Sequence, residues 1–276
     1  MSDTARDIVI GFFAAALLSG LASEHVQRVL ERQLRRDLRT RDVQVRVDQA
    51  GPLGMLFGRA SAVRVRARSA TVDQAPFALQ PGSGLSAHAR QVRLDLRGSR
   101  LAGLEADRLL IHFGDAYVDV GALLRERVVL RRSDAGKATI TVGEELLAKL
   151  VSLRYPAYRD VTARVRADGV TVMADLDLLG VRSQIEVAGH LLLRDGTQVD
   201  VVSPSVRVNG RALDASASES LIRPMNPVLD LDRDMGIGLK VRATGVQLES
   251  GRVRLDAEVW LPVKRDRPEG EGDGAR

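Results

Sequence analysis

From residue 43 onward, apolar and polar residues alternate with a period of two. The alternation is clearest in six segments, which we predict to be strands: 43–47, 63–66, 92–97, 161–166, 170–178 and 253–259. Strands of this kind bury one face and expose the other, as in antiparallel sheets. Turn signals punctuate the later segments, at Asp168-Gly169, Asp195-Gly196, Asn209-Gly210 and Ser250-Gly251.

The amino end follows a helical pattern instead, and one continuous helix from about Thr4 to Leu38 fits it. Residues 8–22 are uncharged, and a stripe of Val26, Leu30, Leu34 and Leu38 follows at a spacing of four. Six arginines occupy the remaining positions after the uncharged run: Arg28, Arg32, Arg35, Arg36, Arg39 and Arg41.

The uncharged run admits three interpretations. A helix over residues 8–22 spans about 22 Å, which is shorter than the roughly 30 Å hydrocarbon core of a bilayer. The run is a membrane anchor or uncleaved signal, a helix packed into the protein's own groove, or a cleaved signal peptide. Against a signal peptide, Asp3 and Asp7 put negative charge in the amino-terminal region, which is positively charged in signal peptides. In the anchor interpretation, the membrane-embedded side chains are Phe12, Phe13, Leu17 and Leu18.

Two shorter segments, 143–153 and 217–222, also favour helices, and the Gly-rich tail over 264–276 is expected to be disordered. We therefore expect an α+β fold, in which a long, curved antiparallel sheet rolls around a long N-terminal helix and one or two short helices. The predicted organisation is an apolar segment over 1–22, an α+β domain over 23–263, and the tail. The halves before and after the Gly143 helix are candidate lobes without a linker between them.

Composition narrows the classes of function. The chain is 45% hydrophobic but only 3% aromatic, so its core is aliphatic. The net charge of +5 comes mostly from arginines on the solvated faces of strands, and scattered aromatics disfavour a nucleic-acid partner. The absence of cysteine excludes disulfides and thiolate metal sites.

No catalytic or metal-binding motif is present in the sequence. The four histidines, at positions 25, 88, 112 and 190, are too far apart for metal-ligand spacing, and phosphate-binding loops and nucleophile elbows are missing. Asp175 and Asp177 share a strand face and are interpreted as solvated strand residues, which leaves a lipid or glycan hydrolase as a minor alternative. We therefore predict a non-enzymatic protein without a cofactor. An acyl chain, by contrast, needs only an aliphatic wall, because each buried methylene contributes about 0.8 kcal/mol.

Four segments resemble the LmeA-like phospholipid-binding family, known from bacterial envelopes. They are "GPLGMLFGRASAVRVRARSATV" from Gly51, "ADRLLIHFGDAYVDVGALL" from Ala106 with "KATITVGEELLAKLV" from Lys137, and "MGIGLKVRATGVQLESGRVRLDAEV" from Met235. The resemblance, over roughly 22–260, implies phospholipid binding, a fold similar to tubular lipid-binding domains, and a role as lipid carrier or sensor in the cell envelope.

The resemblance also suggests a role for the uncharged loop 52–57. Leu53, Met55, Leu56 and Phe57 would form a lip of the lipid groove or a tip that enters the bilayer, with Arg59 meeting anionic headgroups. The alternative is a loop that caps the core.

The expected partners are phospholipid and the membrane surface, with other envelope proteins as further candidates. The exported side of the membrane is favoured, and its cytoplasmic face is the alternative. The competing function is a structural or scaffolding envelope protein with a filled core and no ligand.

Overall fold

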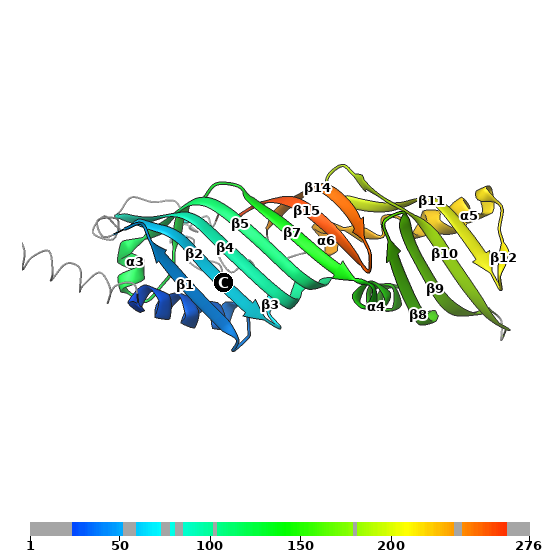
Figure 1. Cartoon of the computed structure of the whole chain (residues 1–276), viewed down its shortest axis with the longest axis horizontal. Helices are drawn as coiled ribbons and strands as arrows, with labels where there is room; N and C mark the ends of the chain where they lie inside the picture. Colours follow the sequence, from blue (N-terminus) through cyan, green and yellow to red (C-terminus); the bar gives the residue numbers. More distant parts are fainter. Residues whose placement is uncertain are drawn as a thin grey trace, which may run out of the picture.

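The chain folds into two β-sheets that lie end to end along the long axis of the molecule (Figure 1). The structure is a computed structural model, and it describes residues 24–51, 59–72, 78–80, 85–101, 104–178, 181–234 and 239–263. The predicted apolar segment 1–22 and the tail 264–276 lie outside the described residues.

The first sheet contains nine strands within the described residues, in the order β1-β2-β4-β5-β7-β15-β14, with β3 beside β4 and β6 beside β5. Their bounds are β1 (Val43–Gln49), β2 (Arg59–Arg68), β3 (Thr71–Val72), β4 (Ser86–Leu101), β5 (Leu104–Asp119), β6 (Leu130–Arg132), β7 (Gly136–Gly143), β14 (Lys240–Glu249) and β15 (Arg252–Trp260). Most neighbours are antiparallel, but β2 and β4 pair in parallel, with Val65 opposite Leu94.

The second sheet is a meander of four long strands, and its two short strands both pair with the last of them. It is formed by β8 (Tyr158–Arg166), β9 (Gly169–Leu178), β10 (Val181–Arg194), β11 (Gln198–Val208), β12 (Arg211–Ala212) and β13 (Leu229–Asp230). The predicted turns connect these strands: Asn209 and Gly210 have φ of 51° and 79°, and Asp195 and Gly196 have φ of 53° and 73°. Positive φ at both residues is what a tight hairpin requires.

The predicted helices over 143–153 and 217–222 are present, and so is the described part of the predicted N-terminal helix, while three further short helical segments were not predicted. Residues 24–37 are helical and are followed by α3 (Val120–Leu124), α4 (Glu144–Arg154), α5 (Ala215–Ile222), the 3₁₀ turn η1 (Arg223–Met225) and α6 (Leu231–Asp234). Asp214 caps α5, because its Oδ1 accepts a hydrogen bond from Ala217 N at 2.7 Å. Among the described residues, none of the helices combines the length and the apolar composition that crossing a bilayer requires.

The helix over 24–37 fills the inner side of the first sheet. Leu34 of this helix and Leu38 directly after it are completely buried among the inward-facing side chains of the strands, which include Val45 and Val65. Glu31 Oε1 also accepts a hydrogen bond from Val45 N at 3.1 Å. A curved sheet around an N-terminal helix confirms the predicted α+β fold.

Two segments of the chain cross between the sheets. The first is α4, which leads from β7 to β8, and the second leads from α5 through η1, β13 and α6 to β14. Direct contacts join the sheets as well, since Gly251 N donates to Val165 O at 3.0 Å and Ala243 N donates to Gly196 O at 2.6 Å. The space between the two crossings is where the candidate site lies.

Candidate functional site

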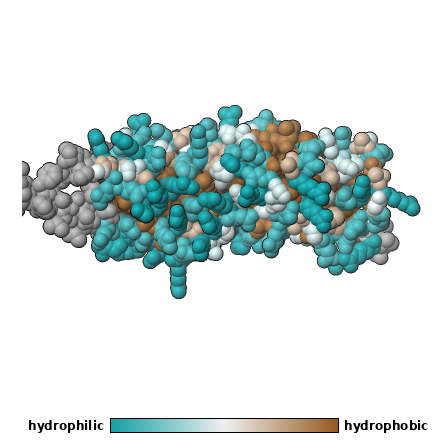
Figure 2. Space-filling model, in the orientation of Figure 1, coloured by the Kyte–Doolittle hydropathy of each residue, from teal (hydrophilic) through white to brown (hydrophobic). Residues whose placement is uncertain are grey.

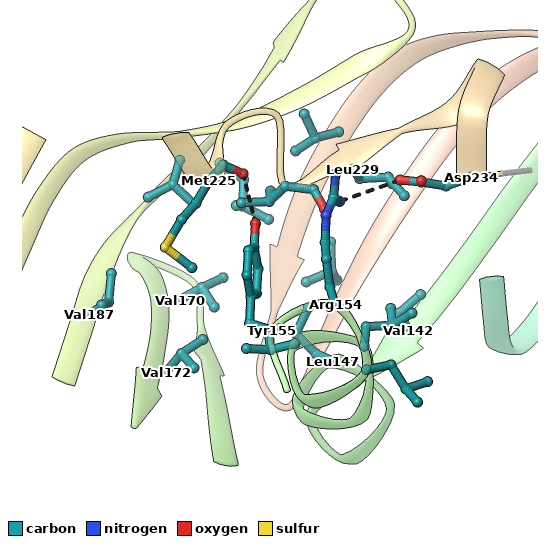
Figure 3. Close-up of a pocket in the computed structure, with 18 of the residues that line it drawn as sticks. Val142, Leu147, Arg154, Tyr155, Val170, Val172, Val187, Met225, Leu229 and Asp234 are labelled. Atoms are coloured by element: carbon teal, nitrogen blue, oxygen red, sulfur yellow. Dashed lines mark hydrogen bonds and ion pairs between the residues drawn. The ribbon is translucent and has the colours of Figure 1, made fainter. Parts of the chain in front are cut away.

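A pocket of about 580 Å³ lies at the junction of the two sheets (Figure 3). Its walls come from β7, β14 and β15 of the first sheet, from β8 to β11 of the second, from α4, and from the segment 222–234. Strand residues form two aliphatic walls: Ile140, Val142, Val246, Val253 and Leu255 in the first sheet, and Val170, Val172, Ala174, Ile185, Val187, Leu191, Val199 and Val201 in the second.

The second wall follows from the alternation along β9. Val170, Val172 and Ala174 face the pocket. On the opposite face, Asp175 is paired with Arg182, whose Nε lies 2.8 Å from Asp175 Oδ2. A strand directs successive side chains to opposite faces, so the carboxylate that sequence analysis weighed as catalytic points away from the cavity.

Helix α4 forms another side of the pocket with its leucines and valine. Leu147, Leu150 and Val151 line the cavity, as does Leu153, which remains 68% exposed. Polar contacts hold the helix in place: Glu144 Oε1 accepts a hydrogen bond from Val165 N at 2.7 Å, and Lys149 Nζ lies 2.7 Å from Glu105 Oε2. The helix is therefore fixed by contacts outside the cavity, and its apolar face stays available to a ligand.

At the carboxyl end of α4, two polar side chains reach across the cavity to the second crossing segment, 222–234 (Figure 3). Arg154 Nη1 donates to Val228 O at 2.7 Å and lies 3.6 Å from Asp234 Oδ2, and Tyr155 Oη donates to Met225 O at 3.2 Å. Burial raises the pKa of Tyr155 above its ordinary value, with smaller contributions from Tyr158 and Asp234. Tyr155 therefore stays a neutral hydrogen-bond donor.

A lining of this kind suits a long aliphatic ligand with a polar end. Ligand pockets usually measure about 300–1,000 Å³ and are mostly apolar with a few polar groups. In the described part of the chain, the lining contains no Ser, Thr, His or Lys, and no group of His, Asp and Glu could hold a metal ion. His112 lies on β5, outside the pocket lining, where burial and Arg93 lower its pKa.

Of the predicted site residues, only Arg59 belongs to the part of the chain that the structure describes. Leu53, Met55, Leu56 and Phe57, together with the anchor residues Phe12, Phe13, Leu17 and Leu18, lie outside the described residues. Arg59 is the exposed first residue of β2 and does not line the cavity. Sequence analysis missed the pocket because its lining has the same alternating pattern as an ordinary core.

The residues that flank segment 52–58 lie at the same end of the first sheet as α3. Arg59 is opposite His88 in the parallel β2–β4 pair, while Ser86 is opposite Asp119, which precedes α3. Two of the most exposed leucines of the described chain are here, Leu85 at 77% and Leu124 at 74%. The exposed Arg125 and Arg127 follow Leu124.

The helix over 24–37 has its amino-terminal part at this same end. Gln33 Oε1 accepts a hydrogen bond from Val128 N at 2.8 Å, close to α3, whereas Leu38 O at the other end of the helix accepts one from Thr71 N at 2.9 Å. Residue 24 is therefore directed toward the end that holds Leu85 and Leu124. We call this region, formed by Leu85, Arg59 and residues 120–127, the α3 end.

Comparison with known proteins gives one match. A family model described as LmeA-like phospholipid-binding matches residues 13–258, which covers most of the chain and all of the pocket lining. The comparisons with curated proteins and with solved structures returned no match.

Proposed function

Because the chain belongs to the LmeA-like phospholipid-binding family, we propose that it is a non-enzymatic lipid carrier or sensor that holds phospholipid acyl chains in the pocket between its two sheets. The observation that carries this proposal is the pocket itself, since about 580 Å³ of mostly aliphatic space connects both sheets. Burying acyl chain there yields about 0.8 kcal/mol per methylene, so no further chemistry is needed to hold the ligand.

The pocket also weighs against the competing scaffold function. A structural protein whose sheets face only their own core needs no cavity of ligand size, and about 300 Å³ is the lower limit for ordinary ligand pockets. The cavity here exceeds that limit. A phospholipid-binding role accounts for the space, and a filled-core scaffold does not.

The membrane contact is proposed at the α3 end. Exposed leucines beside arginines suit a surface where apolar side chains enter the interface and cations meet anionic headgroups. Leu53, Met55, Leu56 and Phe57 belong to a loop whose flanks are at this end, and the apolar run with Phe12, Phe13, Leu17 and Leu18 precedes the helix directed toward it. We propose that these segments hold the protein on a membrane of the cell envelope, on its exported side.

A single substitution in the pocket tests the function. Val172→Asp places a carboxylate on the pocket wall of β9, where a bound chain would have to desolvate it. Native mass spectrometry of the purified full chain should show bound phospholipid, and the variant should lose most of it.

Thr171→Asp is the matched control, because the neighbouring residue on β9 faces the other side of the sheet and is opposite Arg164. The control should retain lipid. If the wild-type protein carries no phospholipid and the delipidated protein captures no fluorescent lipid at micromolar concentration, the proposed function is wrong.

A further inference from the structure

The charged groups of the pocket do not balance. Among the described residues, its lining contains two guanidinium groups, Arg154 and Arg233, but only one carboxylate, that of Asp234. The neighbouring acids Asp230 and Asp232 are not part of the lining. Asp230 accepts from other donors than the two guanidinium groups. Its Oδ1 accepts from the backbone N of Arg233 at 3.2 Å, and its Oδ2 accepts from Gln198 Nε2 at 3.3 Å.

Both guanidinium groups have donors to spare. Arg233 donates to Asp234 through Nε at 2.9 Å and Nη2 at 3.4 Å, and Arg154 donates through Nη1 to Val228 O. A guanidinium has five N–H donors, so Nη1 of Arg233 and the Nε and Nη2 of Arg154 are free of protein acceptors in the described chain. Asp234 Oδ2 also accepts from Asp230 N at 2.9 Å, which leaves it little capacity to satisfy a second arginine.

We infer that Arg233 and Arg154 form an anion subsite that takes the phosphodiester of a phospholipid headgroup. This inference rests on the proposed function and specifies how the pocket recognises its ligand. Arginine forms paired hydrogen bonds with phosphate oxygens that a lysine cannot reproduce. The excess positive charge at the edge of an otherwise apolar pocket is neutralised when a phosphate binds.

The placement of the two arginines fits an amphipathic ligand. Arg154 extends from the end of α4 toward Asp234, with Val170, Val172 and Val187 on one side in the close-up view and Val142 on the other (Figure 3). The side chain of Arg233 is 55% exposed and that of Arg154 is 30% exposed, so the subsite is at the solvent-accessible edge of the pocket. A headgroup there keeps access to water while its chains extend along the aliphatic walls.

The test compares two lipids that differ only in the phosphoglycerol headgroup. Delipidated full-length protein is titrated with fluorescent phosphatidylglycerol and with a diacylglycerol that has the same acyl chains. The wild type should bind phosphatidylglycerol more tightly than diacylglycerol. Arg233→Gln should lower the affinity for phosphatidylglycerol roughly tenfold and change the affinity for diacylglycerol by less than about twofold. Arg223→Gln is the matched control, because it removes the same charge from an exposed residue of the same segment that does not line the pocket.

A second variant separates recognition from structural support. Asp234→Asn keeps an acceptor for Asp230 N but removes the charge that competes for both arginines, so it should strengthen phosphatidylglycerol binding. If the Arg233–Asp234 pair only stabilises the fold, Asp234→Asn will instead weaken both lipids, and the inference is wrong.

The remaining outcomes distinguish this inference from the proposed function. Equal wild-type affinity for the two lipids would refute the anion subsite and leave the lipid pocket standing, whereas binding of neither lipid would refute both. Glycerol phosphate should compete only at millimolar concentration, because it lacks the chains. Competition at micromolar concentration would identify a water-soluble phosphate as the ligand and overturn the headgroup assignment.

Discussion

Asp95 shows how the outer face of the first sheet accommodates a buried charge. The residue is only 7% exposed, and its two carboxylate oxygens accept from Arg108 Nε at 2.8 Å and Nη2 at 2.7 Å. The hydrogen bond from Arg108 holds the pKa of Asp95 below its ordinary value, and the charges of Arg108, Arg97 and Arg93 act in the same direction against the opposing effect of burial. The folded protein therefore binds the Asp95 proton more weakly than the unfolded chain does.

This pair predicts how a substitution depends on pH. A carboxyl group whose folded pKa is depressed stabilises the protein above its unfolded pKa of about 3.9, and that stabilisation is lost as the pH falls through the folded pKa. Asp95→Asn should lower the free energy of unfolding by about 1 kcal/mol at pH near 7, because Arg108 is 40% exposed and water screens the pair. Thermal melts of the wild type and the variant over a range of pH should show that their difference in stability disappears in acid. A difference that stays constant with pH would show that the depressed pKa of Asp95 does not cause it.

Single residues also show what the sequence could predict. The alternation predicted which side of each strand is buried: Val43 and Val45 are each 3% exposed, and the intervening Gln44 is exposed. The same rule could not distinguish Val172, which lines the cavity, from Val165, which is 2% exposed in the core. Both positions demand an apolar residue, and only the packing of distant elements decides whether a ligand or another side chain covers it.

Helix α4 and the helix over 24–37 present leucines in opposite environments. Leu34 is completely buried in the core, whereas Leu153 lines the pocket and is 68% exposed. Leu34→Ala should cost about 2–5 kcal/mol and lower the melting temperature by several degrees. Leu153→Ser should stay within about 0.5 kcal/mol of the wild type but weaken lipid capture, because it removes part of the apolar wall. Thermal melts and lipid titrations of both variants check this, and a large loss of stability in Leu153→Ser would assign α4 to the core.

Helices and turns were predicted well from the sequence where neighbouring residues determine them. The predicted helix 143–153 corresponds to α4, whose acidic Glu144 and Glu145 begin the helix, and the predicted Asn209-Gly210 turn has the required positive φ angles. The parallel pairing of β2 with β4 was not predicted, because alternation is the same in either direction. The division into two sheets likewise depends on long-range pairing, which no local pattern encodes.

At the scale of the whole molecule, the pocket and the α3 end are separate surfaces. In Figure 2, hydrophilic side chains dominate the face over β1, β2, β4 and β5, so the broad side of the first sheet is a poor membrane contact. We therefore expect the molecule to meet the membrane with its α3 end rather than with the outer face of this sheet.

A pair of double variants tests this orientation. Leu85→Ser with Leu124→Ser should reduce sedimentation with anionic liposomes several-fold and leave the melting temperature unchanged, because both side chains are exposed. Leu192→Ser with Leu213→Ser is the matched control, since these leucines are exposed in the second sheet and the segment after it. A chain that begins at Glu24 should bind less than the full chain. If the two double variants lose liposome binding equally, exposed leucines contribute wherever they lie, and the proposed orientation is wrong.

The position of the pocket at the junction of two sheets has a thermodynamic consequence. A lipid in this cavity contacts both sheets, so its binding free energy is realised only while both are folded and correctly docked. The ligand therefore acts as a removable part of the hydrophobic core, which couples the unfolding of one half to that of the other. In the proposed role as a carrier, each release of lipid would also weaken the cohesion between the two halves, and the empty protein would be the less cooperative of the two forms.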